Sequence, residues 1–179
     1  RVTADADFTV ISGGRGFSGP AGCAVGGGCG DAGFDMPVTT AFLGTTHVVT
    51  SPGTDNNSGE SVRVIADVDG TQVFLNGAAA PAATINAGQF FVFVPGTDAP
   101  PPVLITSTQP VTVFQSGGSV GCELGTSYIP PLYFPNVQSS VSFTTTNTLP
   151  THTVNVVIAA ADEPSLRLDG YPIAGAFSL

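Results

Sequence analysis

One stretch of this chain, Ser61 to Gly77, occurs twice in similar form, and this repetition limits the possible folds more than any other feature. The stretch reads SVRVIADVDGTQVFLNG, with apolar and polar residues alternating on both sides of Asp69-Gly70. Alternation with period two is typical of β-strands, and Asp-Gly between two such runs predicts a tight turn with positive φ. The sequence therefore predicts a β-hairpin over residues 61–77.

The second occurrence covers residues 154–170 and reads VNVVIAAADEPSLRLDG. An offset of about 93 residues places Val64 on Val157. Further upstream, FTVISGG at residues 8–14 resembles VTVFQSGG at residues 111–118, where the offset grows to about 104. The pattern indicates one full repeat of about a hundred residues and part of a second.

The rest of the chain also consists of short apolar runs between turns. Among 179 residues there are 23 Gly and 15 Pro, and no window has a convincing 3.6-residue apolar period. We expect an all-β protein with antiparallel sheets in a sandwich-like or barrel-like arrangement, built from two related repeats of about 93–104 residues. The first repeat would span residues 1–107 and the incomplete second one residues 108–179, as two domains or as one pseudo-symmetric domain. An end within a repeat suggests a piece of a longer protein.

Several local predictions follow from the same patterns. The runs on either side of Ala87-Gly88 predict a second hairpin over residues 83–94, and Gln109-Pro110 predicts a turn between strands. Strands are also expected at 141–144 and 153–159, and glycine-rich loops at 12–30 and 117–125.

The charge of the chain excludes several classes of partner. There are only four Arg and no Lys, and the net charge is −9. Nucleic acids and anionic membrane surfaces both require clustered cationic side chains, so neither is expected as a partner. No apolar run reaches 18 residues, so no membrane span is expected either.

Three cysteines, Cys23, Cys29 and Cys122, lack the C-x-x-C spacing of a metal site. In a β-rich chain with few charges, a disulfide in an extracellular setting is expected. A Cys23–Cys29 bridge would restrain the glycine-rich loop, whereas a Cys29–Cys122 bridge would require the two copies to face each other. Both pairings remain open.

Two motifs resemble catalytic or nucleotide-binding signatures without their structural context. Gly14-x-Gly16-x-x-Gly19 follows a strand, but no helix can follow it to face a pyrophosphate. Ser119 lies in a G-x-S-x-G pattern, with His152 and Asp162 or Asp169 later in the chain, yet the helix of a nucleophile elbow is missing. Neither motif supports an enzyme.

Metal binding has limited support. Asp67 and Asp69 are candidate calcium ligands, although the bidentate Glu of an EF-type loop is absent. His47 and His152 lie within strand patterns and are expected to be exposed or partly buried histidines without a metal. We therefore expect no cofactor, with calcium as the only candidate ion.

The order of the motifs resembles a known family. Residues 64–77, the turn Ile85 to Gln89, the strand Val111 to Gly118, Cys122 and Ile129-Pro130-Pro131 together resemble the N-terminal region of IgGFc-binding proteins. This resemblance implies an extracellular, non-enzymatic, β-rich binding module of the kind that also occurs in large bacterial surface and adhesion proteins. It implies no particular residue for Fc binding.

We therefore expect a secreted or cell-surface adhesion module of a bacterial surface protein, which binds a protein or a glycan through loops at 12–30, 51–60 and 116–128. The candidate binding residues are Arg15, Phe17, Asp55, Asn56, Asn57 and Glu123. The first alternative is a structural subunit of an extracellular fibre or sheath, in which copies of the chain complete each other by β-strand addition. The second alternative is a serine esterase.

Overall fold

The structure is a computed structural model that describes residues 5, 12–17, 31–35, 38–50, 61–96, 98–99, 102–118, 124–132, 139–143 and 156–173. The chain divides into two compact units, Arg1–Thr144 and Thr145–Leu179, and each is described by itself. The predicted division into repeats at residue 107 falls inside one strand of the first unit and remains a prediction about the repeats.

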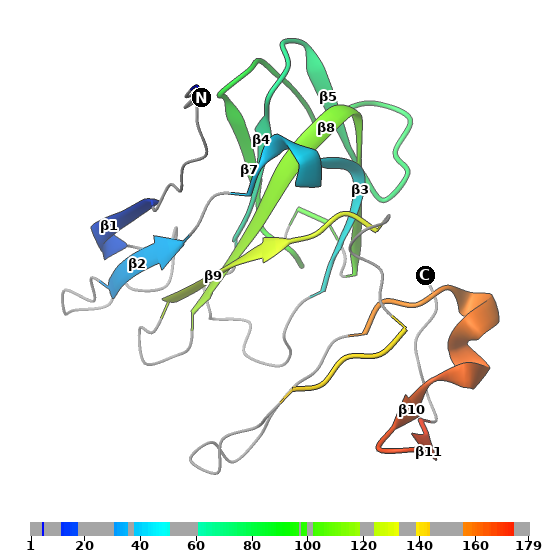
Figure 1. Cartoon of the computed structure of the whole chain (residues 1–179). Coiled ribbons are helices and arrows are strands. Elements are labelled where there is room, and N and C mark those ends of the chain that lie inside the picture. Colours follow the sequence, from blue (N-terminus) through cyan, green and yellow to red (C-terminus); the bar gives the residue numbers. More distant parts are fainter. Residues whose placement is uncertain are drawn as a thin grey trace. The chain divides into compact units, whose positions relative to one another are not determined.

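The described residues of the first unit form strands and one 3-10 helix (Figure 1). They are β1 (Ser12–Phe17), β2 (Asp31–Asp35), η1 (Thr40–Phe42), β3 (Gly44–Val49), β4 (Ser61–Ala66), β5 (Thr71–Leu75), β6 (Ala83–Ile85), β7 (Phe90–Phe93), β8 (Val103–Gly118) and β9 (Leu124–Ile129). The described residues contain no α-helix, and all pairings between these strands are antiparallel. The predicted all-β fold class is confirmed.

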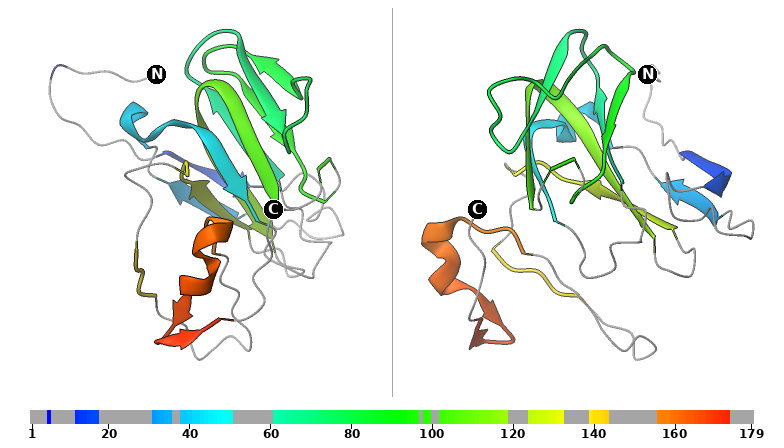
Figure 2. Two further views of the ribbon diagram at one scale, coloured as in Figure 1. Left: turned by 90° about the vertical axis from the view of Figure 1, so that its right-hand side faces the viewer. Right: turned by 180° about the vertical axis from the view of Figure 1, so that it is seen from behind.

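Strand β8 is the centre of a seven-stranded sheet. Its first part pairs with β3 and β5, and its second part pairs with β4 and β9. Between the two parts the register with β3 jumps, since Thr46 lies opposite Thr106 but Gly44 lies opposite Val111. The strand bends sharply there (Figures 1 and 2), at the predicted Gln109-Pro110 turn, so its halves belong to two layers, β3-β8-β5-β6 and β9-β8-β4-β7.

The two predicted hairpins, 61–77 and 83–94, are wrong, because neither pair of consecutive strands is hydrogen-bonded together. β4 pairs with β7 and β8, and β5 pairs with β6 and β8. At residues 67–70 and 86–89 the chain instead crosses from one layer to the other. Positive φ occurs at Gly70 but not at Asp69, so this turn is not the expected hairpin type. Crossing lets consecutive strands face each other over the core instead of lying side by side.

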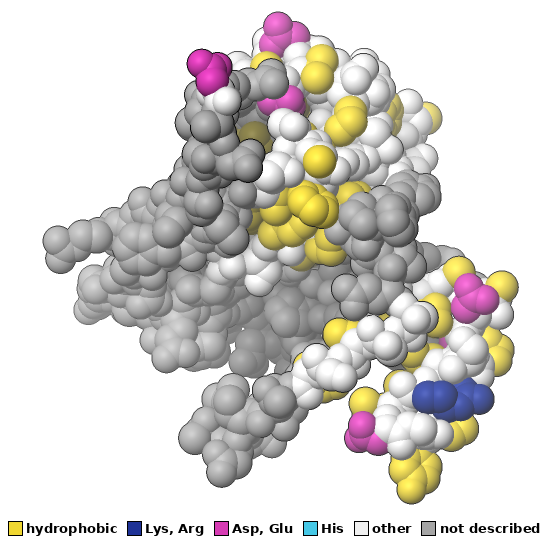
Figure 3. All heavy atoms as spheres, viewed as in Figure 1, with side chains coloured by type: hydrophobic (Ala, Val, Ile, Leu, Met, Phe, Trp, Pro, Cys, Tyr) yellow, Lys and Arg dark blue, Asp and Glu magenta, His cyan; other side chains and the backbone are white. Residues whose placement is uncertain are grey.

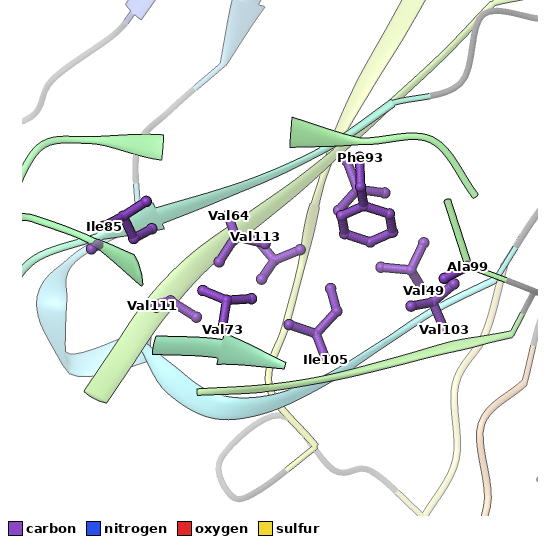
Figure 4. Packing of buried hydrophobic residues seen from close by; sticks show 12 residues of the cluster. Val49, Val64, Val73, Ile85, Phe93, Ala99, Val103, Ile105, Val111 and Val113 are labelled. Atoms are coloured by element: carbon purple, nitrogen blue, oxygen red, sulfur yellow. The ribbon is translucent and has the colours of Figure 1, made fainter. Parts of the chain in front are cut away.

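The core lies between the two layers (Figure 4). Val64 and Val113 on one layer face Val73 and Ile105 on the other. The other members of this cluster are Val49, Val62, Ala66, Ile85, Phe93, Ala99, Val103 and Val111. Burying one such valine, isoleucine or phenylalanine stabilises the fold by about 1.5–3 kcal/mol. The β-branched residues of the alternating runs therefore supply most of the packing.

His47 closes the seam between β3 and the segment that follows β9. Its side chain is fully buried, with Nδ1 3.0 Å from the Ile129 carbonyl oxygen and Nε2 3.2 Å from that of Gly44. Pro131 packs directly on Gly44, where an added Cβ would clash with the proline side chain. The prediction of an exposed or partly buried His47 is wrong, because the ring is fully buried in the seam, where the single N–H of its neutral form donates to one of these two carbonyl oxygens.

Hydrogen bonds tie the crossings together at one end of the sandwich. Asp69 Oδ1 accepts the Ala87 N–H at 2.9 Å, and Asn86 Oδ1 accepts the Gly70 N–H at 3.1 Å. The Gln72 N–H donates to Thr108 Oγ1 at 3.0 Å, which joins the bend of β8 to the same group. Side-chain oxygens thus satisfy backbone donors that the sheet leaves unpaired.

Three further predictions of local structure are corrected. Ser12–Phe17 forms β1, paired with β2, instead of the start of a glycine-rich loop. Gly117 and Gly118 pair with β9, so most of the predicted loop 116–128 is strand. In both places a neighbouring strand supplies the hydrogen bonds that weak β-propensity does not predict. Conversely, Val141–Phe143 is described but belongs to no strand.

The second unit contains η2 (Ala160–Ser165), β10 (Arg167–Leu168) and β11 (Tyr171–Pro172). The last two strands pair across Asp169-Gly170. The predicted strand 153–159 is not formed over its described part, Val156–Ala159. None of the helices described in either unit is long and apolar enough to span a membrane.

Candidate binding surface

The layer β9-β8-β4-β7 turns one face to the core and the other away from it. Val62 and Val64 of β4 lie in the core, so Arg63 and Ile65 point to the opposite side. The strand registers place Val92, Arg63, Phe114 and Tyr128 in one row across four strands. The neighbouring row holds Phe90, Ile65 and Thr112. We call these seven residues the outer face.

The outer face is mainly apolar and partly exposed. Phe90 is 60% exposed and Val92 is 37% exposed, while Ile65, Phe114 and Tyr128 are half-buried. Phe114 and Tyr128 are in edge contact, with ring centroids 6.1 Å apart. Contiguous apolar side chains on a soluble surface are typical of interaction sites, whereas single ones are ordinary. Figure 3 shows apolar side chains grouped on the described surface of the first unit, with acidic side chains only at its upper end.

Arg63 provides a cation in the middle of this face. Its Nη1 donates to Ser116 Oγ at 3.0 Å, and that hydroxyl lies 3.3 Å from Thr126 Oγ1. A guanidinium has five N–H donors, so a neutral partner leaves its charge and most of its donors for a ligand. Arginine and aromatic residues are among the residue types enriched at protein interfaces.

Tyr128 links the outer face to helix η1. Its hydroxyl donates to the Phe42 carbonyl oxygen at 2.6 Å. Burial raises the pKa of Tyr128 above its ordinary value, so the hydroxyl remains protonated and can donate this bond at neutral pH. The row across the sheet is therefore held in place at its β9 end.

None of the predicted binding residues is among the seven of the outer face. Arg15 and Phe17 belong to β1, whose backbone alone is described. Asp55, Asn56, Asn57 and Glu123 fall outside the described residues, and so do Cys23, Cys29 and Cys122. Their roles in binding, and the disulfide, remain predictions.

Of the two calcium candidates, Asp67 and Asp69, the structure gives Asp69 a structural role. Asp69 accepts a backbone N–H at the crossing, and Asp67 is exposed two residues away. No group of three or more His, Cys, Asp or Glu side chains suited to a metal occurs within the described ranges. Ser119 and His152 of the esterase alternative lie outside those ranges, while Asp162 and Asp169 are exposed.

The sequence contained a signal for the outer face that the loop-based prediction did not use. Gln89 to Val94 reads QFFVFV, which is apolar at consecutive positions instead of alternating. In a strand, such a run makes both faces apolar. Because Phe91 and Phe93 are directed inward, Phe90 and Val92 lie on the opposite side and make that side apolar.

Three polar residues of the family-like motifs serve the scaffold. Asn76 Oδ1 accepts the Leu104 N–H at 2.8 Å, and Gln89 Oε1 accepts the Asn86 N–H at 2.9 Å. Together with Asn86 at the crossing, these side chains hold turns in place. They do not indicate which ligand the protein binds.

A family model described as "IgGFc binding protein" matches residues 1–178. Neither the curated proteins nor the solved structures give a match. The family is one of extracellular binding modules, which agrees with a rigid β-scaffold that exposes an apolar face. The chain belongs to the IgGFc-binding protein family.

Proposed function

We propose that the protein is a non-enzymatic adhesion module of a bacterial surface protein, and that its outer face binds a protein partner. The observation that carries this proposal is the row in which Arg63 lies between Val92 and Phe114, beside the exposed Phe90. Family membership supports an extracellular binding role.

The chemistry of the outer face favours a protein over a glycan. Sugars require several directed polar groups, whereas six of the seven residues here are apolar, aromatic or hydroxyl-bearing and one is a cation. An apolar, aromatic surface with a central arginine is suited to a protein interface. Because the chain carries a net charge of −9, Arg63 would pair with a carboxylate of the partner, while the rest of the surface would repel acidic regions.

The test uses an immobilised IgG Fc fragment as the first probe, because the family description names this partner. Phe90→Ser should weaken binding by about tenfold or more, since exposed aromatic anchors carry much of the binding energy. Val68→Ser is the control, because Val68 is also an exposed apolar residue, 42% exposed, and lies at a crossing outside the outer face.

The results distinguish the position of the binding face from the identity of the partner. Loss of binding in Phe90→Ser alone would support the outer face. Equal binding by both variants would exclude this face, and absence of binding by the wild-type chain would exclude the Fc region as its partner. The fibre or sheath alternative remains a separate prediction.

A further inference from the structure

Strand β7 forms an end of the described sheet. It pairs with β4 on one side, and no described strand pairs with its other side. The Ala66 N–H donates to the Gln89 carbonyl oxygen at 3.1 Å, which fixes the alternation of the ladder. Gln89, Phe91 and Phe93 thus direct their backbone groups toward β4, and Phe90, Val92 and Val94 direct theirs to the open side.

The open side ends at Val94. Asp98 Oδ2 accepts the Val94 N–H at 2.6 Å, and the Asp98 N–H donates to the Val94 carbonyl oxygen at 2.9 Å. At the other end, the Gly88 N–H donates to the Ala66 carbonyl oxygen at 2.8 Å. The free segment therefore offers the N–H and C=O groups of Phe90 and Val92.

β7 is short, with four residues, and it carries none of the other devices by which proteins prevent strand addition. Natural edge strands carry charged side chains, proline or bulges that block pairing with another chain. Residues 90–93 read FFVF, and their ladder with β4 is regular. Even with the whole chain present, Phe90 and Val92 are exposed.

We propose that a second copy of this chain pairs with β7 in antiparallel fashion about a two-fold axis. Phe90 would lie opposite Val92 of the partner subunit, and Val92 opposite the partner's Phe90. This register is the only one that uses all four free groups on each copy. Centring the axis on Phe90 would oppose Val92 to Gly88, whose N–H is engaged, and centring it on Val92 would oppose Phe90 to the capped Val94.

A second copy fits this edge because the edge is complementary to itself. An interface about a two-fold axis brings identical patches together, so any charge on the strand would meet its like. The chain has a net charge of −9, yet β7 carries none of it. Antiparallel pairing also keeps Phe90 and Val92 of both copies on one side of the sheet. The outer faces of the two copies would join into one apolar surface.

The test is sedimentation velocity on the complete chain over a range of concentrations, with reductant present to remove any link through cysteine. The wild-type chain should show a reversible monomer–dimer equilibrium. Val92→Pro removes the outward N–H of each copy without removing a bond to β4, and it should raise the dissociation constant about thirtyfold, since two hydrogen bonds are lost. Val92→Thr keeps both the N–H and the branched side chain and should dimerise within about threefold of wild type.

Phe90→Lys provides a second variant if Val92→Pro does not fold, because a lysine on the edge repels its symmetry mate. It should also give a monomer. A wild-type chain that stays monomeric at every concentration would overturn the proposal. So would a folded Val92→Pro variant, verified by circular dichroism, that dimerises like the wild type.

Discussion

Residues 61–77 and 154–170 have similar sequences and different structures. Val64 is fully buried in β4, whereas Val157, at the corresponding position, is 45% exposed and belongs to no strand. β4 lies between β7 and β8, and no described strand lies beside Val156–Ala159. A strand therefore depends on its neighbours as much as on its own pattern.

The turns of the two regions, in contrast, are alike. Asn76 and Gly77 have φ of 51° and 70°, and Asp169 and Gly170 have φ of 51° and 85°. Both pairs adopt the left-handed conformation that Asn-Gly and Asp-Gly accept at low cost. Turn geometry is thus decided by a few adjacent residues. The turn therefore forms in both regions, although only the first region has strands paired with distant parts of the chain.

The largest expected difference between the regions concerns Val64 and Val157. Val64→Asp would place a carboxylate in the core and should destabilise the protein by more than about 4 kcal/mol. Val157→Asp should change the free energy of unfolding by less than about 0.5 kcal/mol, because the residue is exposed. Urea denaturation of the two variants provides the measurement. A similar decrease in the free energy of unfolding in both variants would show that Val157 is buried in solution, and the two regions would then not differ in this respect.

The pH dependence of stability should come from the first unit. Burial lowers the pKa of His47 below its ordinary value of 6.5, and the carbonyls of Gly44 and Ile129 only partly oppose this shift. The unfolded chain therefore binds the proton first. The stabilisation is complete above about pH 6.5 and is lost as the pH falls through the folded-state pKa.

His47→Gln tests this dependence. The variant should lose about 1–3 kcal/mol near neutral pH and should lose the extra acid sensitivity of the wild type. Denaturation curves between about pH 5 and pH 8 for both proteins give the difference. His152, which belongs to the second unit, is present in both proteins and so contributes equally to both curves. Parallel pH profiles for wild type and variant would contradict the role of His47.

The smallest expected difference concerns the turns. A Cβ at Gly77 or Gly170 meets nothing within 4 Å, so alanine costs only the backbone strain of positive φ, about 1 kcal/mol. Gly77→Ala should lower the stability of the sandwich by that amount. Gly170→Ala should leave it within about 0.5 kcal/mol, because its hairpin is exposed. Thermal unfolding followed by circular dichroism distinguishes the two, and an equal shift would indicate that the units unfold together.

Much of the fold could be predicted from the sequence, but the pairing of its strands could not. Alternation at 61–66 and 71–75 indicated which side chains are buried and where the strands end. The same alternation fits a hairpin, with the strands side by side, and a crossing, with the strands on opposite layers. The choice depends on which distant strand, here β8, pairs with each one.

The candidate surface was missed for a related reason. Loops were expected to bind because they are exposed, and the outer face depends on the row that joins β7, β4, β8 and β9. Single-sequence patterns place Arg63 and Phe114 on strands but cannot place them beside each other. His47 was misjudged likewise, since its partners Gly44 and Ile129 lie 3 and 82 residues away.

The crossings joined by Asp69 and Asn86 limit where insertions and deletions can occur during the evolution of such proteins. Because these side chains bind backbone groups of a neighbouring crossing, a change of length at that end would break several bonds at once. The strand ends at Val49, Ser61 and Val103 lie at the other end, where Gln115 Nε2 donates to the carbonyl oxygen of Thr50, the residue after β3. Insertions between those strands leave the first end untouched. We therefore expect relatives to keep the loop lengths at the end that holds the crossings and to vary in loop length and sequence at the opposite end.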